Sequence, residues 1–184
     1  MKLKFLFIVG LITALAACSN SNQTMISNPV TESGVVKITW HDPQKYTDID
    51  AAGELQSRFE QKVFATLTAD LNKQASKVLK ANEKLVLMVT NVDLAGDVRP
   101  TFGEVSNDIR VVKDIYPPRI AFSYKVMKDS RVVLSGDEKL QDMFFMSGIQ
   151  PLVQRPYMYE ASLLTHWFNK KISPRFEGSH QSSY

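Results

Sequence analysis

Three aspartates of this chain stand where acidic side chains could do chemistry together. Asp42 and Asp48 follow a predicted strand over residues 35–40, and Asp93 follows a second predicted strand over residues 85–92. If the two strands are parallel, their carboxyl ends share one edge of the sheet, where ligands of α/β proteins collect. Clustered carboxylates bind a cation through oxygen ligands or form an acid/base pair with separated pKa values. The same edge would also carry the neighbouring side chains His41, Tyr46, Asp50 and Asp97.

A structural role for these residues is an equally concrete alternative. Thr47 or Asp50 could cap the helix that follows, because their oxygens accept hydrogen bonds from unpaired N–H groups of a first turn. Asp42 stands before a proline and Asp97 after a glycine, which is common in turns. We favour capping and turn formation, with a ligand or metal edge of unknown metal as the alternative.

The sequence carries no common signature of catalysis. It has no Gly-rich phosphate loop, no HExxH or GxSxG motif and no DxDxDG calcium loop. Its three histidines, His41, His166 and His180, fall in separate segments. We therefore predict no catalytic residue and no cofactor. Whether the protein is an enzyme stays open, and a non-enzymatic role is favoured.

Five arginines could bind anionic glycans or lipid phosphates. They are Arg99, Arg110, Arg119, Arg131 and Arg155. Guanidinium groups suit such ligands because they form bidentate hydrogen bonds. Since these arginines fall in separate segments, we favour a solvated, salt-bridged surface instead.

Large apolar residues gather in a proline-interrupted segment before the last predicted helix. They are Phe144, Phe145, Met146, Ile149, Leu152, Tyr157 and Met158. Met and aromatic side chains adapt to varied surfaces, so the segment could be a flap that contacts a partner or lipid. We favour a loop that wraps the core.

The N-terminus has the features of a bacterial lipoprotein signal. Lys2 and Lys4 precede an apolar run over residues 5–17, and Cys18, the only cysteine, follows directly. A helix of about 13 residues spans about 20 Å, short of the roughly 30 Å hydrocarbon core, so a signal peptide fits better than a spanning helix. The Leu-Ala-Ala-Cys sequence resembles the lipobox of bacterial lipoproteins. That resemblance implies cleavage before Cys18 and its acylation by chains such as palmitate.

The residue after the cysteine predicts to which of the two bacterial membranes the lipoprotein is attached. In lipoprotein sorting an Asp at this position favours the inner membrane, and here it is Ser19. The resemblance therefore implies a lipid anchor at the periplasmic face of the outer membrane. The alternative is an ordinary secretory signal followed by an incidental thiol.

After the signal peptide (residues 1–17), the chain divides into three parts. Residues 18–33 are rich in Ser and Asn, which predicts the lipidated cysteine and a flexible tether. Residues 34–172 form a single globular domain, and residues 173–184 a flexible polar tail.

Within the domain, the patterns predict an α/β (α+β) two-layer sandwich. Residues 51–80 repeat apolar side chains every four positions, which is typical of an amphipathic helix between the two strands. Strand, helix and strand form a βαβ unit. Alternation over residues 120–127 and a turn at 128–130 predict an antiparallel meander, and a second helix is expected over residues 159–171. The sheet would be mixed, with about five strands and two helices on one face.

Four landmarks of the domain resemble a known family. They are Trp40-x-Asp42-Pro43-x-x-Tyr46-Thr47-Asp48, Val92-Asp93-Leu94-Ala95-Gly96, Pro118-Arg119-Ile120 and Trp167-Phe168. Together they resemble the proteobacterial envelope proteins of domain of unknown function 3016. The resemblance implies an envelope location and adds no catalytic residue. The family pattern has Asp at the position of Asn91, which argues against an essential carboxylate there.

Composition narrows the classes of function. Lys and Arg total 22 against 19 Asp and Glu, too even a balance for a strongly basic nucleic-acid binder. We predict an envelope lipoprotein that acts as a non-enzymatic binding or accessory module, attached to the membrane through Cys18, with an envelope protein or glycan as a partner. The alternative is a metal-assisted or carboxylate-dependent periplasmic hydrolase that uses Asp42, Asp48 and Asp93.

Overall fold

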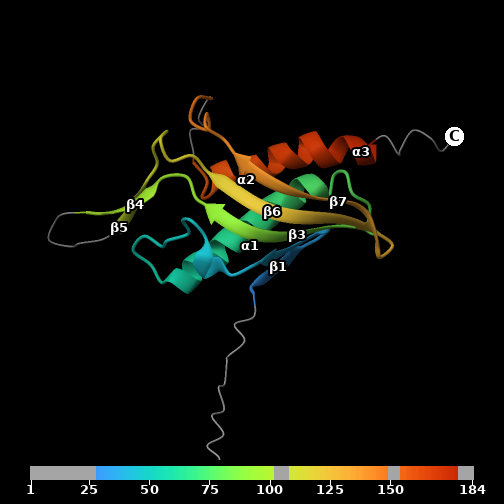
Figure 1. The fold of residues 1–184 in the computed structure, drawn as a ribbon, viewed down its shortest axis with the longest axis horizontal. Helices are drawn as coiled ribbons and strands as arrows, with labels where there is room; N and C mark the ends of the chain where they lie inside the picture. Colours follow the sequence, from blue (N-terminus) through green and yellow to red (C-terminus); the bar gives the residue numbers. More distant parts are fainter. Residues whose placement is uncertain (1–27, 102–107, 149–153, 178–184) are drawn as a thin grey trace, which may run out of the picture.

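The computed structural model describes residues 28–101, 108–148 and 154–177, and Cys18 and His180 lie outside these ranges. Its main sheet has the strand order β1-β2-β3-β6-β7. The bounds are β1 Val30–Ser33, β2 Val36–Trp40, β3 Glu83–Asp93, β6 Arg119–Lys128 and β7 Arg131–Gln141. The helices α1 (Gln56–Ala75) and α2 (Met158–Trp167) contact each other over one face of this sheet (Figure 1). The predicted two-layer α+β sandwich with a mixed sheet is confirmed.

The predicted βαβ unit forms the centre of the domain. β2 pairs in parallel with β3, so that Ile38 lies opposite Leu87, and α1 connects the two strands. β3 is interior in the sheet but alternates buried and exposed residues, with Met88 44% exposed. The helices lie on one face only, so the other face of this strand is left exposed.

The apolar stripe of α1 forms the core beneath the sheet. Phe59, Val63 and Leu67 are buried, and the ring of Phe64 stacks on Trp40 at a centroid distance of 4.1 Å. Burying large apolar side chains contributes roughly 1.5–3 kcal/mol each, which holds the helix to the sheet. The helix is shorter than the expected residues 51–80. It begins after its N-cap residue, Leu55, which is 67% exposed, and it ends at Ala75.

The last residues of the expected tether belong to the sheet. β1 is an edge strand that pairs antiparallel with β2. The Thr31 hydroxyl accepts a hydrogen bond from Trp40 Nε1 at 2.9 Å and contacts Thr68 Oγ1 at 2.6 Å. The prediction of a tether through residue 33 is corrected, because polar residues are tolerated in an edge strand when their side chains find partners.

The C-terminal elements extend beyond the predicted domain end. α2 continues through a π-helical segment, Phe168–Ile172, into the short helix α3, Ser173–Glu177. Ile172 and Ser173 are buried, and Ser173 Oγ contacts Glu177 Oε1. The start of the expected tail is therefore helical, because its first residues still pack against the domain. Within the described residues, no helix is both long and apolar enough to cross a membrane.

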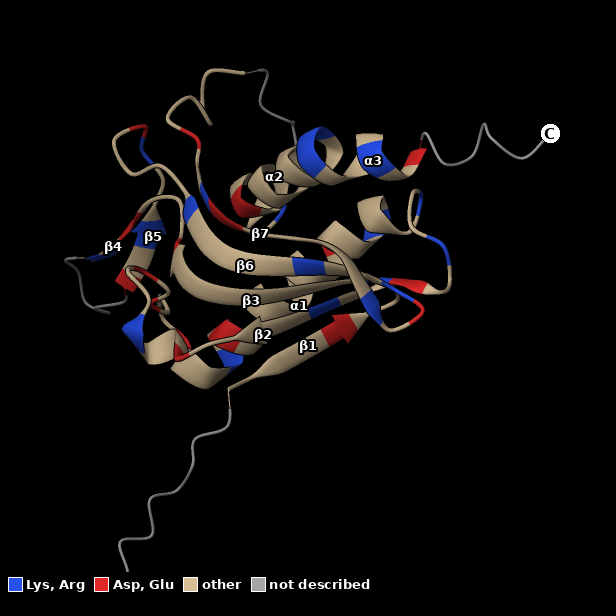
Figure 2. Cartoon of the chain, turned by 45° about the vertical axis from the view of Figure 1, so that its right-hand side comes forward, with Lys and Arg blue, Asp and Glu red and all other residues tan. Residues whose placement is uncertain are grey.

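The segment between β3 and β6 forms a small second sheet. β4 (Asp97–Pro100) and β5 (Asp108–Val111) pair antiparallel with each other. These two strands lie outside the main sheet. Figure 2 shows acidic and basic residues interspersed around this two-stranded sheet and the loops beside it.

The apolar loop after β7 projects from the domain. Phe144 is 78% exposed and Met143 56% exposed, while Phe145 packs edge-on against Tyr159 at 4.8 Å. The prediction that this segment wraps the core is wrong for Phe144, which points to solvent, and confirmed for Tyr157, which packs against the core beside Phe59. Ile149 and Leu152 lie outside the described residues.

Candidate functional site

The parallel strands bring Asp48 and Asp93 to the same edge of the sheet. The Asp48 N–H donates to the Val92 carbonyl at 3.1 Å, and the Leu94 N–H donates to the Asp48 carbonyl at 3.1 Å. These bonds prolong the β2–β3 pairing by one bridge between Asp48 and Asp93. Nearby, the buried Tyr46 hydroxyl donates to the Val89 carbonyl at 3.0 Å. The backbone thus fixes this edge.

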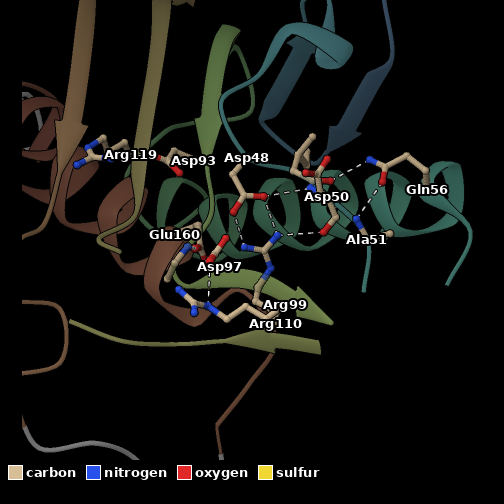
Figure 3. Close-up of polar contacts among 12 residues, drawn as sticks. Asp48, Asp50, Ala51, Gln56, Asp93, Asp97, Arg99, Arg110, Arg119 and Glu160 are labelled. Carbon is tan, nitrogen blue, oxygen red and sulfur yellow. Dashed lines mark hydrogen bonds and ion pairs between the residues drawn. The ribbon is translucent and has the colours of Figure 1, made fainter. Parts of the chain in front are cut away.

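Asp48 is paired with an arginine from the second sheet. Arg110 Nη1 and Nη2 donate to the two Asp48 carboxylate oxygens at 2.7 and 2.8 Å, and Nη2 also reaches the Asp50 carbonyl at 3.0 Å (Figure 3). Burial disfavours the cation, but the hydrogen bond and charge of Asp48 outweigh it and raise the pKa of Arg110. The side chains of Arg110 and Asp48 are 16% and 19% exposed, so the pair is well shielded from water.

The other two predicted aspartates also have basic partners. Arg119 Nη1 donates to Asp93 at 2.6 Å, and Lys45 Nζ donates to Asp42 at 2.8 Å. The hydrogen bond from Lys45 lowers the pKa of Asp42, and its charge acts in the same direction. Asp42 has a left-handed backbone conformation with φ of 49° and takes no part in the Asp48–Asp93 bridge. The structure therefore brings two of the three aspartates together and gives a cation to each of the three.

The neighbours of these aspartates have structural contacts. The His41 ring contacts Asn28 Nδ2 at 3.0 Å, and Asp97 pairs with Arg99 at 3.0 Å. Asn91 Oδ1 accepts the Thr47 N–H at 2.8 Å, a role that an amide fills without a charge. Among the described residues, no group of three or more His, Cys, Asp or Glu side chains is arranged to hold a metal ion.

The expected helix cap is not formed by Thr47 or Asp50. The N-cap residue of α1 is Leu55, which makes no side-chain hydrogen bond to the helix. Instead, Gln56 Oε1 accepts the Ala51 N–H and Gln56 Nε2 donates to the Ile49 carbonyl, both at 2.9 Å. The capping interpretation is wrong, because the chain needs five further residues after Asp50 to reach the helix.

A cavity opens beside the Asp48–Arg110 pair. Its volume is about 390 Å³, and it lies between the start of α1, the loop after β3, β5 and the segment that enters α2. Its lining residues are Ala52, Phe59, Leu94, Ala95, Arg110, Val112, Gln154, Arg155, Pro156, Tyr157, Met158, Tyr159 and Glu160. Mostly apolar walls with a few polar groups are typical of small-molecule sites.

Glu160 is the buried acid of this cavity. It is 2% exposed, and its Oε1 accepts the Ala95 N–H at 2.7 Å. Burial raises the pKa of Glu160, against the opposing effects of the Ala95 hydrogen bond and the nearby Arg110 charge. Arg110 Nε is buried and has no hydrogen-bond acceptor among the described residues. The wall therefore holds both a carboxyl group that favours its neutral form and an unused donor.

Glu160 is not among the residues predicted from the sequence, and Arg110 was predicted only as one of five arginines. Glu160 lies on the same helical face as Leu164 and Trp167, at spacings of four and seven residues. An acidic residue on the apolar face of a helix is a signal that could have been used. Nothing local to Arg110 predicts its partner, because that partner is 62 residues away in the chain.

Gly96 allows the loop after β3 to approach β5 closely. Its φ is 91°, and a Cβ added there would lie 2.6 Å from the Val111 carbonyl oxygen. The Gly96 N–H donates to the Tyr116 carbonyl at 3.1 Å. Only glycine tolerates this approach without a shift of the backbone. The close packing places Arg110, the neighbour of Val111, against the sheet edge.

Three of the four landmark segments meet at this edge, where Asp48 bridges to Asp93 and Arg119 pairs with Asp93, whereas Trp167 packs against Phe122 and Tyr124 on the face of the sheet. A family model described as a protein of unknown function, DUF3016, matches residues 34–170, which is most of the chain and nearly all of the described domain. No curated protein and no solved structure matches the chain. The chain belongs to the DUF3016 family of proteins of unknown function.

Proposed function

We propose that this protein is a non-enzymatic binding module of the bacterial envelope. The observation that carries the proposal is how the edge is occupied: Asp42, Asp48 and Asp93 each contact a basic side chain. A carboxylate that already neutralises an arginine is a poor metal ligand or general base, because recruiting it would leave that cation unpaired. The adjoining cavity, by contrast, has mostly apolar walls and one hydrogen-bond donor without an acceptor among the described residues, Arg110 Nε, which suits binding.

The proposed location is the periplasmic face of the outer membrane, with lipid on Cys18 as the anchor. Its support is the sequence alone: a short basic start, an apolar run and a cysteine followed by Ser19. Two or more acyl chains hold a protein on a bilayer durably. The family match begins at residue 34 and β1 at Val30, so the domain follows the proposed lipid site closely. An envelope protein or glycan is the proposed partner.

Metal analysis separates this function from the hydrolase alternative. The protein is purified without chelators from its own envelope, and its metal content is measured by mass spectrometry, beside Asp48→Asn and Asp93→Asn variants. We expect less than stoichiometric metal in all three. Stoichiometric metal in the parent that disappears in both variants would overturn the proposal and favour the hydrolase. Asp97→Asn is the matched control, because Asp97 pairs with Arg99 on the exposed side of the same region.

A further inference from the structure

The cavity beside Arg110 has the size and walls of a site for a small organic molecule. Its volume of about 390 Å³ lies within the roughly 300–1,000 Å³ range of such pockets. Phe59 and Tyr157 form an edge-to-face pair at 5.9 Å, and Leu94 and Val112 add aliphatic surface. These groups would contact the apolar part of a bound molecule, and such burial is favourable.

The polar groups of the cavity are mainly hydrogen-bond donors. Arg110 Nε is buried without an acceptor among the described residues, although Nη1 and Nη2 hold Asp48. Burial raises the pKa of Tyr157, so its hydroxyl keeps its proton. Burial likewise favours the neutral form of Glu160. A bound molecule would therefore need to supply acceptors.

The net charge of the lining favours an anion. Asp48 offsets the charge of Arg110, and Glu160, the only acidic residue that lines the described cavity, favours its neutral form, so the lining is close to neutral before Arg155 is counted. Arg155 adds a second cation: its side chain is 63% exposed, and its contact with Asp70 is 3.5 Å long. Asp70 is held more closely by Lys73, at 2.7 Å, so Arg155 can turn toward a ligand without leaving Asp70 unpaired.

We propose that this cavity binds a small amphipathic carboxylate. Arg155 and Arg110 hold its anionic group, and its apolar part lies against Phe59 and Tyr157. The inference rests on the proposed binding function and names the ligand class. A carboxylate matches the donors because arginine–carboxylate hydrogen bonds are charge-assisted and about twice as strong as neutral ones.

Three probes with the same tail and different heads test the ligand class. Octanoate, octylamine and octanol are titrated by calorimetry into the chain from residue 18 onward, which carries Cys18→Ser so that no detergent competes. We expect octanoate to bind at least about tenfold more tightly than either other probe, as the loss of one charge-assisted contact predicts. Equal or tighter binding of octylamine, or no binding of octanoate, would overturn the proposal.

Two variants test the site itself. Arg155→Gln is expected to weaken octanoate binding about tenfold and to leave octanol binding unchanged, because it removes the positive charge and keeps a polar side chain. Arg131→Gln is the matched control, since Arg131 is an exposed arginine at the start of β7 and outside the cavity lining. Equal octanoate affinities of the two variants would contradict the assignment.

A third variant blocks the cavity without removing a charge. Ala52 lines the cavity from the loop before α1, so Ala52→Trp should fill part of it and abolish octanoate binding. Circular dichroism checks that this variant is folded, and retained binding would place the octanoate elsewhere. The metal analysis keeps the two proposals apart: a metal-free protein that binds no octanoate refutes only the ligand class, whereas stoichiometric metal bound by the aspartates refutes the binding function as well.

Discussion

Asp48 and Arg110 form a shielded ion pair between the sheet edge and β5, and removing one charge tests its contribution. Asp48→Asn keeps the shape but leaves the Arg110 guanidinium without a counter-ion. We expect the variant to lose about 1–3 kcal/mol of unfolding free energy, measured by urea denaturation. Asp97→Asn, in the exposed pair with Arg99, should lose at most about 1 kcal/mol. A more stable Asp48→Asn protein would mean that repulsion among the carboxylates dominates the edge.

Glu160 gives the fold a pH dependence with a defined sign. Because burial raises its pKa above the value of 4.5 in an unfolded chain, the folded state holds this proton more tightly. The group leaves stability unchanged below that value and lowers stability as pH rises toward its folded pKa. Glu160→Gln keeps an acceptor for the Ala95 N–H and removes the ionisation. We expect similar urea midpoints for parent and variant at about pH 4, and a higher midpoint for Glu160→Gln at about pH 8.

The matched control for this titration is Asp114→Asn, at an exposed position in the loop before β6. Its midpoint should follow that of the parent at both pH values. If the parent instead gains stability over Glu160→Gln as pH rises, the ionised carboxylate is stabilised in the fold by the Arg110 charge.

At the level of residues, the sequence predicts which carboxylates lie at one edge of the sheet, but it does not predict which basic side chains they pair with. Asp48 and Asp93 each follow a recognisable strand, and the parallel connection brings them together. Their partners Arg110 and Arg119 lie in separate segments, and ion pairing across such distances has no local pattern. The favoured interpretation of a solvated, salt-bridged arginine surface is confirmed for Arg119, whose side chain is 46% exposed, but it is wrong for Arg110, which is paired yet shielded from water.

Helix α1 depends on its buried face, so truncating that face should unfold it with the sheet. Phe59→Ala and Leu67→Ala are each expected to cost about 2–5 kcal/mol in urea denaturation, because they remove buried volume from the core. Lys62→Ala, on the exposed side, should cost at most about 1 kcal/mol despite its contact with Glu54. Equal losses in the two groups would mean that this stripe does not anchor the helix.

Helices and strands were predictable wherever side-chain periodicity was strong. The central helix and the strands near residues 85–92 and 120–127 all appear at the expected places. The ends of helices and strands could not be predicted from the sequence, because they depend on tertiary contacts. β1 is polar, and it is held as a strand by its pairing with β2 and by the hydrogen bond that Thr31 accepts from Trp40. α3 begins directly after Ile172, which is buried in the domain.

For the whole molecule, the anchor prediction rests on one thiol. Cys18→Ser removes the acceptor of the lipid, so the variant should stay as an unprocessed precursor and should not incorporate radioactive fatty acid. Inhibition of the lipoprotein signal peptidase in the parent should also accumulate precursor, which serves as the size marker. Fatty-acid labelling of Cys18→Ser would show that the lipobox interpretation is wrong.

The tight β6–β7 hairpin also sets the order in which the chain gains structure. These strands are joined by Asp129 and Ser130, both with positive φ. β2 and β3, by contrast, are separated in the chain by all of α1, so their pairing closes a much longer loop. Closing a short loop costs less chain entropy than closing a long one. We therefore expect a transition state for folding that contains the hairpin. In stopped-flow experiments Val126→Ala should slow refolding, and Ile38→Ala should chiefly accelerate unfolding.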